Sequence, residues 1–242
     1  MNKLDNHNQQ PFVSAIVLAA GKGTRMNAGI NKQFLTLKGK PILAHTLDAF
    51  ERIPSVREII AVISKNEYGM FERRILKKYR YTKVRVVPGG EERQESAYRG
   101  LLAVDPDCDM VMFHDGARPL IDRETILKSI EETKVYHATV VGVPAKNTIK
   151  VIDRRGVVSY TPDRQTLVEV QTPQTFDYDL IMKAYRTAIA EKAPATDDAT
   201  LVERIGHPVK IVSGHYNNLK ITTSEDLMTA SAIIGLKRQK SL

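Results

Sequence analysis

The chain has 242 residues, of which 42% are hydrophobic and 26% charged, and these proportions are typical of a globular protein and exclude a largely disordered one. The formal net charge of +8 favours anionic partners, and the absence of Trp and of RNA-binding motifs favours small phosphorylated ligands over nucleic acid. The single cysteine excludes an internal disulfide, and no run of about 18 apolar residues is present to span a membrane.

The length fits one domain over residues 1–242, with flexible ends at residues 1–12 and 237–242. Residues 1–11 are polar and lack the apolar core of a secretory signal. We therefore expect a cytoplasmic protein with no membrane partner.

The N-terminal apolar run predicts a buried strand that leads directly into a glycine-rich loop. Residues 13–20 are mostly β-branched or small, and Gly21 and Gly23 follow them. Glycines allow a sharp turn that presents backbone N–H groups to an anion, and Arg25 and Lys32 add two cations. This combination indicates a nucleoside triphosphate site.

Two common phosphate-binding motifs do not fit this loop. Met26 stands where the dinucleotide fingerprint G-x-G-x-x-G requires its third glycine, and the Walker A pattern G-x-x-x-x-G-K-[ST] is absent. The alternative to a phosphate-binding loop is a glycine-rich turn whose surface charges bind nothing.

The next segments alternate between helical and strand patterns. Apolar residues at helical spacing predict helices over residues 41–53 and 66–80, and β-branched runs predict strands over residues 58–64 and 83–88. A second glycine pair, Gly89 and Gly90, ends the last of these strands, before a helix that runs to residue 103. These patterns predict parallel β-α-β units.

A strand over residues 109–113 is followed by the sequence HDGARP. Ligands of open α/β sheets bind beyond the carboxyl ends of the strands, which is where this sequence lies. Asp115 has the oxygen ligands that Mg²⁺ prefers, and Arg118 can bind a phosphate through two hydrogen bonds. An Asp that caps a turn and pairs with the Arg is the structural alternative. His114, beside an apolar strand, is interpreted as a structural residue.

The remaining segments predict a helix over residues 122–136 capped by Asp122, a strand over 138–143, helices over 178–191 and 196–203, a strand over 209–212 and a helix over 224–236 capped by Ser224. The fold class is therefore a three-layer α/β fold with a mostly parallel sheet.

Residues 148–152 and 157–161 interrupt this alternation, because they predict a two-stranded hairpin around a turn at residues 153–156. A lone hairpin has too little core to be stable by itself. We therefore expect the inserted arm, about residues 145–170, to pack against another subunit.

Five stretches carry a resemblance to a known family. LAAGKGTRM and the following NKQF resemble the nucleotidyltransferases that activate sugar and polyol phosphates, and HDGARP, QTPQTF and TDDATLVE narrow the resemblance to the 2-C-methyl-D-erythritol 4-phosphate cytidylyltransferases of the non-mevalonate isoprenoid pathway. The resemblance extends over about residues 14–234. It implies a Rossmann-like fold, a homodimer formed through the inserted arm, and transfer of CMP from CTP to the polyol phosphate with release of pyrophosphate.

The resemblance also implies roles for individual residues. Its catalytic cations are Arg25, Lys32 and Lys220, and Asp115 is the ligand of Mg²⁺ or another divalent cation. The nucleotide is bound by backbone groups of Ala19, Ala20, Gly21 and Gly23, and the cytosine by Gly90, Glu91 and Ser96. The second substrate is bound by Asp115, Arg118, Thr148, Arg164 and Thr172, of which Thr148 and Arg164 are on the arm and serve the neighbouring subunit.

The chain departs from the family pattern at three positions. Glu91 stands where the family often has Asp, and Asn147 replaces the acidic residue of the pattern K-D-T. Asn217 occupies a position where some relatives carry Asp, which leaves Asp115 as the one predicted metal ligand.

Three other functions remain open on the sequence. A ribitol-5-phosphate cytidylyltransferase shares most of these motifs. A glycosyltransferase would need a D-x-D metal motif, which Asp105 and Asp107 match by letter although they precede the strand. A non-catalytic protein that binds nucleotides or nucleic acid would use the same basic residues and release no pyrophosphate.

Overall fold

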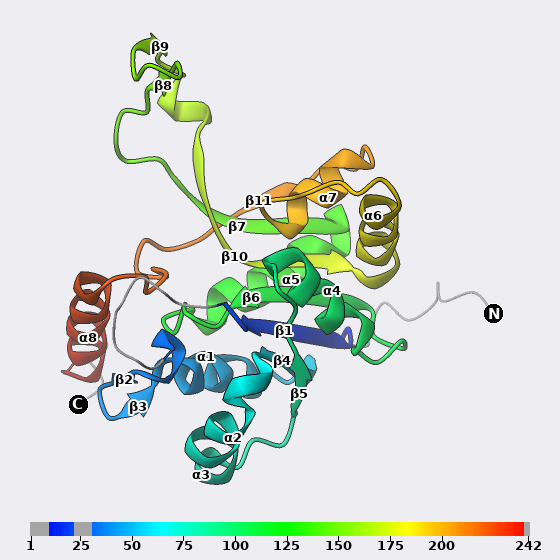
Figure 1. Ribbon diagram of the computed structural model, residues 1–242, viewed down its shortest axis with the longest axis vertical. Helices are drawn as coiled ribbons and strands as arrows, with labels where there is room; N and C mark the ends of the chain where they lie inside the picture. The colour runs from blue at the N-terminus through cyan, green and yellow to red at the C-terminus, as the bar shows by residue number, and fades with distance from the viewer. Residues whose placement is uncertain (1–9, 22–30, 240–242) are drawn as a thin grey trace.

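A computed structural model describes residues 10–21 and 31–239 of the chain. Its centre is a seven-stranded sheet in the order β11-β7-β10-β6-β1-β4-β5 (Figure 1). Every neighbouring pair is parallel except the two that involve β10, which is antiparallel to β6 and β7. The strands are β1 (Val13–Ala19), β4 (Val56–Ile63), β5 (Val84–Pro88), β6 (Met110–Asp115), β7 (Ala138–Pro144), β10 (Val168–Asp177) and β11 (Lys210–Ser213).

Helices cover both faces of the sheet and complete the three predicted layers. Alternate residues of β1 enter two separate hydrophobic clusters, because successive side chains of a strand point to opposite faces. One cluster includes α1 (Ile42–Glu51), α5 (Arg123–Tyr136) and the segment with α2 (Tyr68–Phe71) and α3 (Lys77–Tyr79). The other includes α4 (Arg93–Leu102), α6 (Tyr178–Ala190) and α7 (Asp198–Arg204). The predicted fold class is confirmed.

The segment predicted as one helix over residues 66–80 is irregular. A 3₁₀ turn, Lys65–Glu67, precedes α2, and a π-helical turn, Glu72–Leu76, separates α2 from α3. Phe71 and Ile75 are nevertheless buried against the sheet, as the apolar spacing predicted. The hydrophobic pattern thus located the buried face correctly but not the change in helical pitch.

The sequence did not predict β10. Its central residues are polar, and polar runs do not suggest a buried strand. In the structure Gln171, Thr172, Gln174 and Thr175 are all buried, and their side chains hydrogen-bond to neighbouring strands, loops and helices. The strand is therefore stabilised by polar contacts that only the folded chain reveals.

Two further corrections concern short segments. β2 (Thr36–Leu37) and β3 (Lys40–Pro41) form a small hairpin that the sequence analysis missed, with Gly39 at a φ of 85° in its turn. The last helix, α8 (Ser224–Gln239), is capped by Thr223 and not by Ser224. The Thr223 hydroxyl accepts from the Asp226 N–H, and the Asp226 carboxylate accepts from the Thr223 N–H, which is the reciprocal arrangement of a capping box.

The predicted hairpin is present and projects away from the sheet (Figure 1). It consists of β8 (Val151–Ile152) and β9 (Val158–Tyr160), which pair only with each other among the described strands. The Asp153 carboxylate accepts from the N–H groups of Arg155 and Val157 and holds the turn. The residues that the structure describes include no helix long and apolar enough to cross a membrane.

Candidate active site

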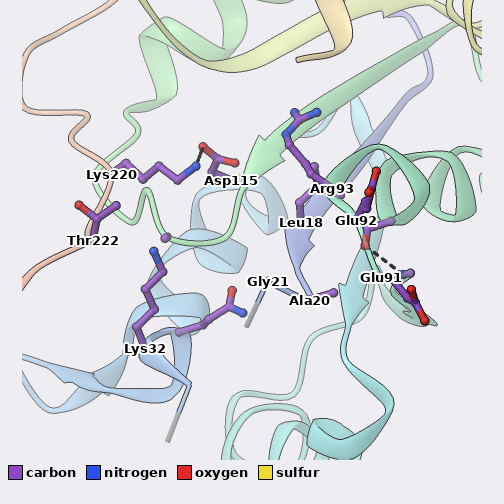
Figure 2. Close-up of a pocket in the computed structure, with 14 residues that line it drawn as sticks. Leu18, Ala20, Gly21, Lys32, Glu91, Glu92, Arg93, Asp115, Lys220 and Thr222 are labelled. Carbon is purple, nitrogen blue, oxygen red and sulfur yellow. Dashed lines mark hydrogen bonds and ion pairs between the residues drawn. The ribbon is translucent and has the colours of Figure 1, made fainter. Parts of the chain in front are cut away.

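The main candidate site is a cavity of about 470 Å³ at the carboxyl ends of β1 and β6 (Figure 2). The chain continues from β1 to β4 on one side of it and returns to β6 on the other, so the cavity lies at a topological switch point of the sheet. Its walls come from five segments: the end of β1, residues 32–33, the segment 90–96, the turn after β6, and the turn before α8. The lining residues include Ala20, Gly21, Lys32, Gly90, Glu91, Arg93, Ser96, Asp115, Lys220 and Thr222.

Asp115 forms the acidic centre of the cavity. Lys220 Nζ lies 3.0 Å and Arg118 Nε 3.4 Å from Asp115 Oδ2. Burial alone would raise the pKa of Asp115, but the charges of Lys220 and Arg118 outweigh burial and lower the pKa to about 2. The carboxylate is therefore ionised at neutral pH.

A buried polar network fixes Asp115 from behind. The Asp115 N–H donates to Thr172 Oγ1 at 3.1 Å, and this hydroxyl lies 3.1 Å from Nδ1 of His114. Nε2 of His114 donates to the Arg118 carbonyl at 3.2 Å, so Nδ1 is the acceptor of the Thr172 hydroxyl. Burial lowers the pKa of His114 to about 4, which keeps it neutral. His114 is thus the structural residue that the sequence predicted.

We expect Thr172→Val to weaken this network, because Val removes the hydroxyl that both accepts from Asp115 and donates to His114. Two buried hydrogen bonds are lost and the unfolding free energy should fall by about 1–3 kcal/mol, as measured by urea denaturation. Thr172→Ser keeps the hydroxyl and should retain most of the stability. Equal losses in both variants would contradict the role of the hydroxyl.

Lys32 is presented to the cavity by the residues on either side of it. The Asn31 side chain donates to the Gly21 carbonyl at 2.7 Å, and the Gln33 side chain donates to the carbonyl of Ala19. Lys32 extends toward the side of the cavity that carries Asp115 and Lys220 (Figure 2). Of the other loop residues predicted to bind the triphosphate, Gly23 and Arg25 lie outside the described residues.

The predicted base-binding residues lie together on the opposite wall. The Gly90 N–H donates to Ser96 Oγ at 3.0 Å, and Glu91 lies at the rim of the cavity (Figure 2). Gly89 packs so closely on the Ala20 side chain that a Cβ at position 89 would lie 2.1 Å from the Ala20 Cβ. The two glycine-containing loops therefore form one continuous surface.

Arg93 was not indicated by any sequence motif. It lines the cavity between Asp115 and residues 89–91, here called the base loop. Its guanidinium contacts the fully buried carboxylate of Asp198 through two hydrogen bonds of 2.6 and 3.2 Å. The Tyr185 hydroxyl donates to the same carboxylate. Burial alone would lower the pKa of Arg93, but Asp198 raises it by more. The acidic pair 197–198 was the signal available in the sequence, although nothing in it identified the partner.

Comparison with known proteins gives the family. The model of the 2-C-methyl-D-erythritol 4-phosphate cytidylyltransferase family matches residues 13–236. The chain belongs to this family. A curated cytidylyltransferase of this name from Caldanaerobacter subterraneus subsp. tengcongensis is 47% identical, over 92% of this chain and 98% of the relative, and one from Alkaliphilus oremlandii is 46% identical, over 93% and 96%.

Solved structures agree with this result. The 4-diphosphocytidyl-2C-methyl-D-erythritol synthase of Anaerococcus prevotii superposes with a TM-score of 0.84 at 37% identity, covering 94% of this chain and all of the other. The cytidylyltransferase of Thermus thermophilus superposes with a TM-score of 0.76 at 29% identity, covering 91% and 98%. The resemblance that the sequence motifs indicated is confirmed, and so is the enzyme class, a nucleotidyltransferase.

Within one chain of this cytidylyltransferase, the predicted arm residues do not reach the cavity. Thr148 and Arg164 are exposed on the arm, where Arg164 Nη1 donates to the Lys146 carbonyl at 3.1 Å. Arg118 lies behind Asp115, with Nη1 donating to the Asn218 carbonyl at 2.7 Å, and Thr172 lies behind the cavity wall. Of the five residues predicted to bind the second substrate, Asp115 alone lies on the wall of the cavity.

The glycosyltransferase alternative does not fit the structure. Asp105 and Asp107 precede β6 and lie at the end of the sheet opposite the cavity. Asp105 Oδ1 accepts from the Asp107 N–H at 2.9 Å, so this carboxylate stabilises a turn. The D-x-D match is a structural turn.

Proposed function

We propose that the chain transfers CMP from CTP to 2-C-methyl-D-erythritol 4-phosphate, giving 4-CDP-2-C-methyl-D-erythritol and pyrophosphate. The observation that carries the proposal is that Lys32, Lys220 and Asp115 line the same cavity as the base loop, in a chain of this family. The phosphate of the second substrate attacks the α-phosphorus of CTP, and the bond from this phosphorus to the bridging oxygen of pyrophosphate breaks.

This reaction needs charge neutralisation more than proton transfer. The second pKa of a phosphate monoester is about 6, so the nucleophile is largely a dianion at pH 7 and requires no general base. This agrees with the position of His114, which is fully buried and neutral behind the cavity. Lys32 and Lys220 are placed to offset the charge that develops on the reacting phosphates, which is the main requirement of phosphoryl transfer.

Mg²⁺ or another divalent cation belongs to the proposal, with Asp115 as its ligand. Among the described residues, the contacts that Lys220 and Arg118 make with this ionised carboxylate are to Oδ2, and Oδ1 is the oxygen that we propose binds the cation. The described residues contain no group of three or more acidic, His or Cys side chains arranged to hold a metal alone. A single carboxylate fits Mg²⁺ that is bound jointly with substrate phosphates, and the ion would supply further neutralisation of their charge.

The test is pyrophosphate release from CTP and Mg²⁺ with methylerythritol phosphate and ribitol 5-phosphate in parallel, with Lys32→Ala as the control. Release with methylerythritol phosphate that is lost in Lys32→Ala and on removal of the metal supports the proposal. Release only with ribitol phosphate would overturn the substrate. No release with either would leave binding of nucleotides or nucleic acid, and a filter-binding assay with CTP and RNA would then identify the ligand.

The proposal includes a homodimer formed through the arm, residues 145–170, in the cytoplasm, where CTP is available. The hairpin carries three exposed apolar residues, with exposed fractions of 58% for Ile152, 51% for Val158 and 59% for Tyr160. Apolar side chains that are gathered on a projecting two-stranded element need a covering surface, and a second copy supplies one. The arm would also carry Thr148 and Arg164 to the neighbouring cavity.

We expect the double substitution Ile152→Lys and Val158→Lys to convert the dimer into monomers, because the added charges cannot be buried between two arms. The mass from light scattering should halve, and kcat/KM for methylerythritol phosphate should fall at least tenfold. Val135→Lys, at an exposed apolar position on α5, is the matched control and should change neither. A double variant that stays dimeric and fully active would exclude the arm as the interface.

A further inference from the structure

Three consecutive residues of the base loop are each held by a different side chain of α4. The Gly90 N–H donates to Ser96, and the Glu91 N–H donates to Glu95 Oε2 at 2.8 Å. The Gly89 carbonyl accepts from Arg99 Nη1 at 2.8 Å. Ser96 was predicted from the family resemblance, whereas Glu95 and Arg99 have no role in the function described so far.

Glu95 and Arg99 also bind each other, so that the two loop contacts form one unit. Arg99 Nη2 lies 2.6 Å from Glu95 Oε1, one helical turn apart. The carboxylate packs directly on Gly90, because a Cβ at position 90 would lie 2.3 Å from Glu95 Cδ. The hydrogen bond from the Glu91 N–H is the largest cause of a lowered pKa at Glu95, so the carboxylate is ionised in this arrangement at neutral pH.

Helix capping explains only part of this geometry. Glu95 is the third residue of α4, and a Glu at that position commonly accepts from N–H groups that precede the helix. Arg99 is different, because it reaches over two turns to a carbonyl that is not part of the helix. An exposed ion pair contributes little to stability by itself. The double contact of Arg99 therefore fixes the position of the loop more than it stabilises the helix.

We propose that Glu95 and Arg99 are positioning residues for recognition of the nucleobase: together they fix residues 89–91 so that the Glu91 carboxylate meets the edge of the base. This inference rests on the proposed function. Cytosine presents an exocyclic amine where uracil presents a carbonyl oxygen, and a carboxylate accepts from the amine and repels the oxygen. A loop held in place therefore selects CTP over UTP, and a loosened loop selects less well.

Arg99→Ala and Glu95→Ala test the proposal, with steady-state kinetics measured on CTP and on UTP. We expect either variant to raise the KM for CTP about tenfold with kcat within twofold of wild type, and to lower the CTP:UTP ratio of kcat/KM about tenfold. Arg99→Lys keeps the charge but cannot donate in two fixed directions, so it should be intermediate. Glu131→Ala, which breaks an exposed ion pair with Lys134 on α5, is the matched control and should change neither value.

Amide hydrogen exchange gives a readout that does not depend on activity. Without nucleotide, the amide of Glu91 should exchange faster in Arg99→Ala than in wild type or in Glu131→Ala. A lower unfolding free energy with an unchanged CTP:UTP ratio and unchanged exchange at Glu91 would overturn the proposal and leave capping as the role of Glu95. If the wild-type protein releases no pyrophosphate, the proposed function fails, and exchange at Glu91 together with calorimetric binding of CTP and UTP still decides whether these side chains position the loop.

Discussion

Lys220→Met is expected to lower kcat by about 10²–10³, which is the usual effect of removing one group that stabilises developing charge in a transition state. Met has a similar length and removes only the charge and its hydrogen bonds. Lys220 Nζ lies 3.0 Å from Asp115 at the wall of the cavity, where Lys32 also points. Stopped or continuous assays of pyrophosphate release at saturating CTP would measure the change.

The control is Lys183→Met, because Lys183 is exposed on α6 and outside the cavity. It tests whether loss of one positive charge from a chain of net charge +8 is enough to slow the reaction. Lys220→Arg restores the charge and should recover part of the activity. A kcat in Lys220→Met within threefold of wild type would remove Lys220 from the catalytic groups.

The same substitution has a consequence for pH. The pKa of Asp115 is lowered from 3.8 to about 2, so its charge stabilises the fold above about pH 4, and this contribution is lost as the pH falls from about 4 to about 2. Without the charge of Lys220, less of the effect of burial is offset, and the pKa of Asp115 rises. The acid side of both the stability curve and the pH–rate profile should therefore move to higher pH in Lys220→Met.

The parts of the fold that the sequence predicted are those in which local pattern and burial agree. The apolar runs of β1, β4, β5 and β6, with glycines directly after β1, β5 and β6, indicated both the sheet and the edge that carries the site. β10 was not predicted because its buried face is polar: Thr172 and Gln174 bind other strands and helices, and the strand therefore lacks the usual hydrophobic signal.

The spacing of residues along the sequence does not show which residues that are far apart in the chain come into contact. Arg93 and Asp198 are 105 positions apart, and neither flanking sequence specifies the other as its partner. Each lies in a stretch with a recognisable sequence pattern, since Arg93 follows the second glycine pair and Asp198 begins a capped helix. The sequence thus located both segments, and only the fold shows that they meet at the wall of the cavity.

Arg93→Met is expected to lower the unfolding free energy by about 3–5 kcal/mol, because it leaves the fully buried Asp198 carboxylate without its cation. Tyr185 still donates one hydrogen bond to this carboxylate, but a neutral donor does not offset a buried charge. Urea denaturation followed by circular dichroism would measure the loss. Lys77→Met, which breaks the exposed pair with Glu72, should cost less than about 1 kcal/mol.

The double variant Arg93→Met and Asp198→Leu separates stability from function. Replacing both members of a buried ion pair by apolar residues restores much of the stability that the single substitution loses, since no charge remains buried. Arg93→Met should also weaken nucleotide binding, because Arg93 lines the cavity, and the double variant should not restore this binding. If the double variant recovers both stability and nucleotide binding, the ion pair serves the fold alone. If Arg93→Met by itself is as stable as wild type, the other neighbours of Asp198 suffice to stabilise its charge.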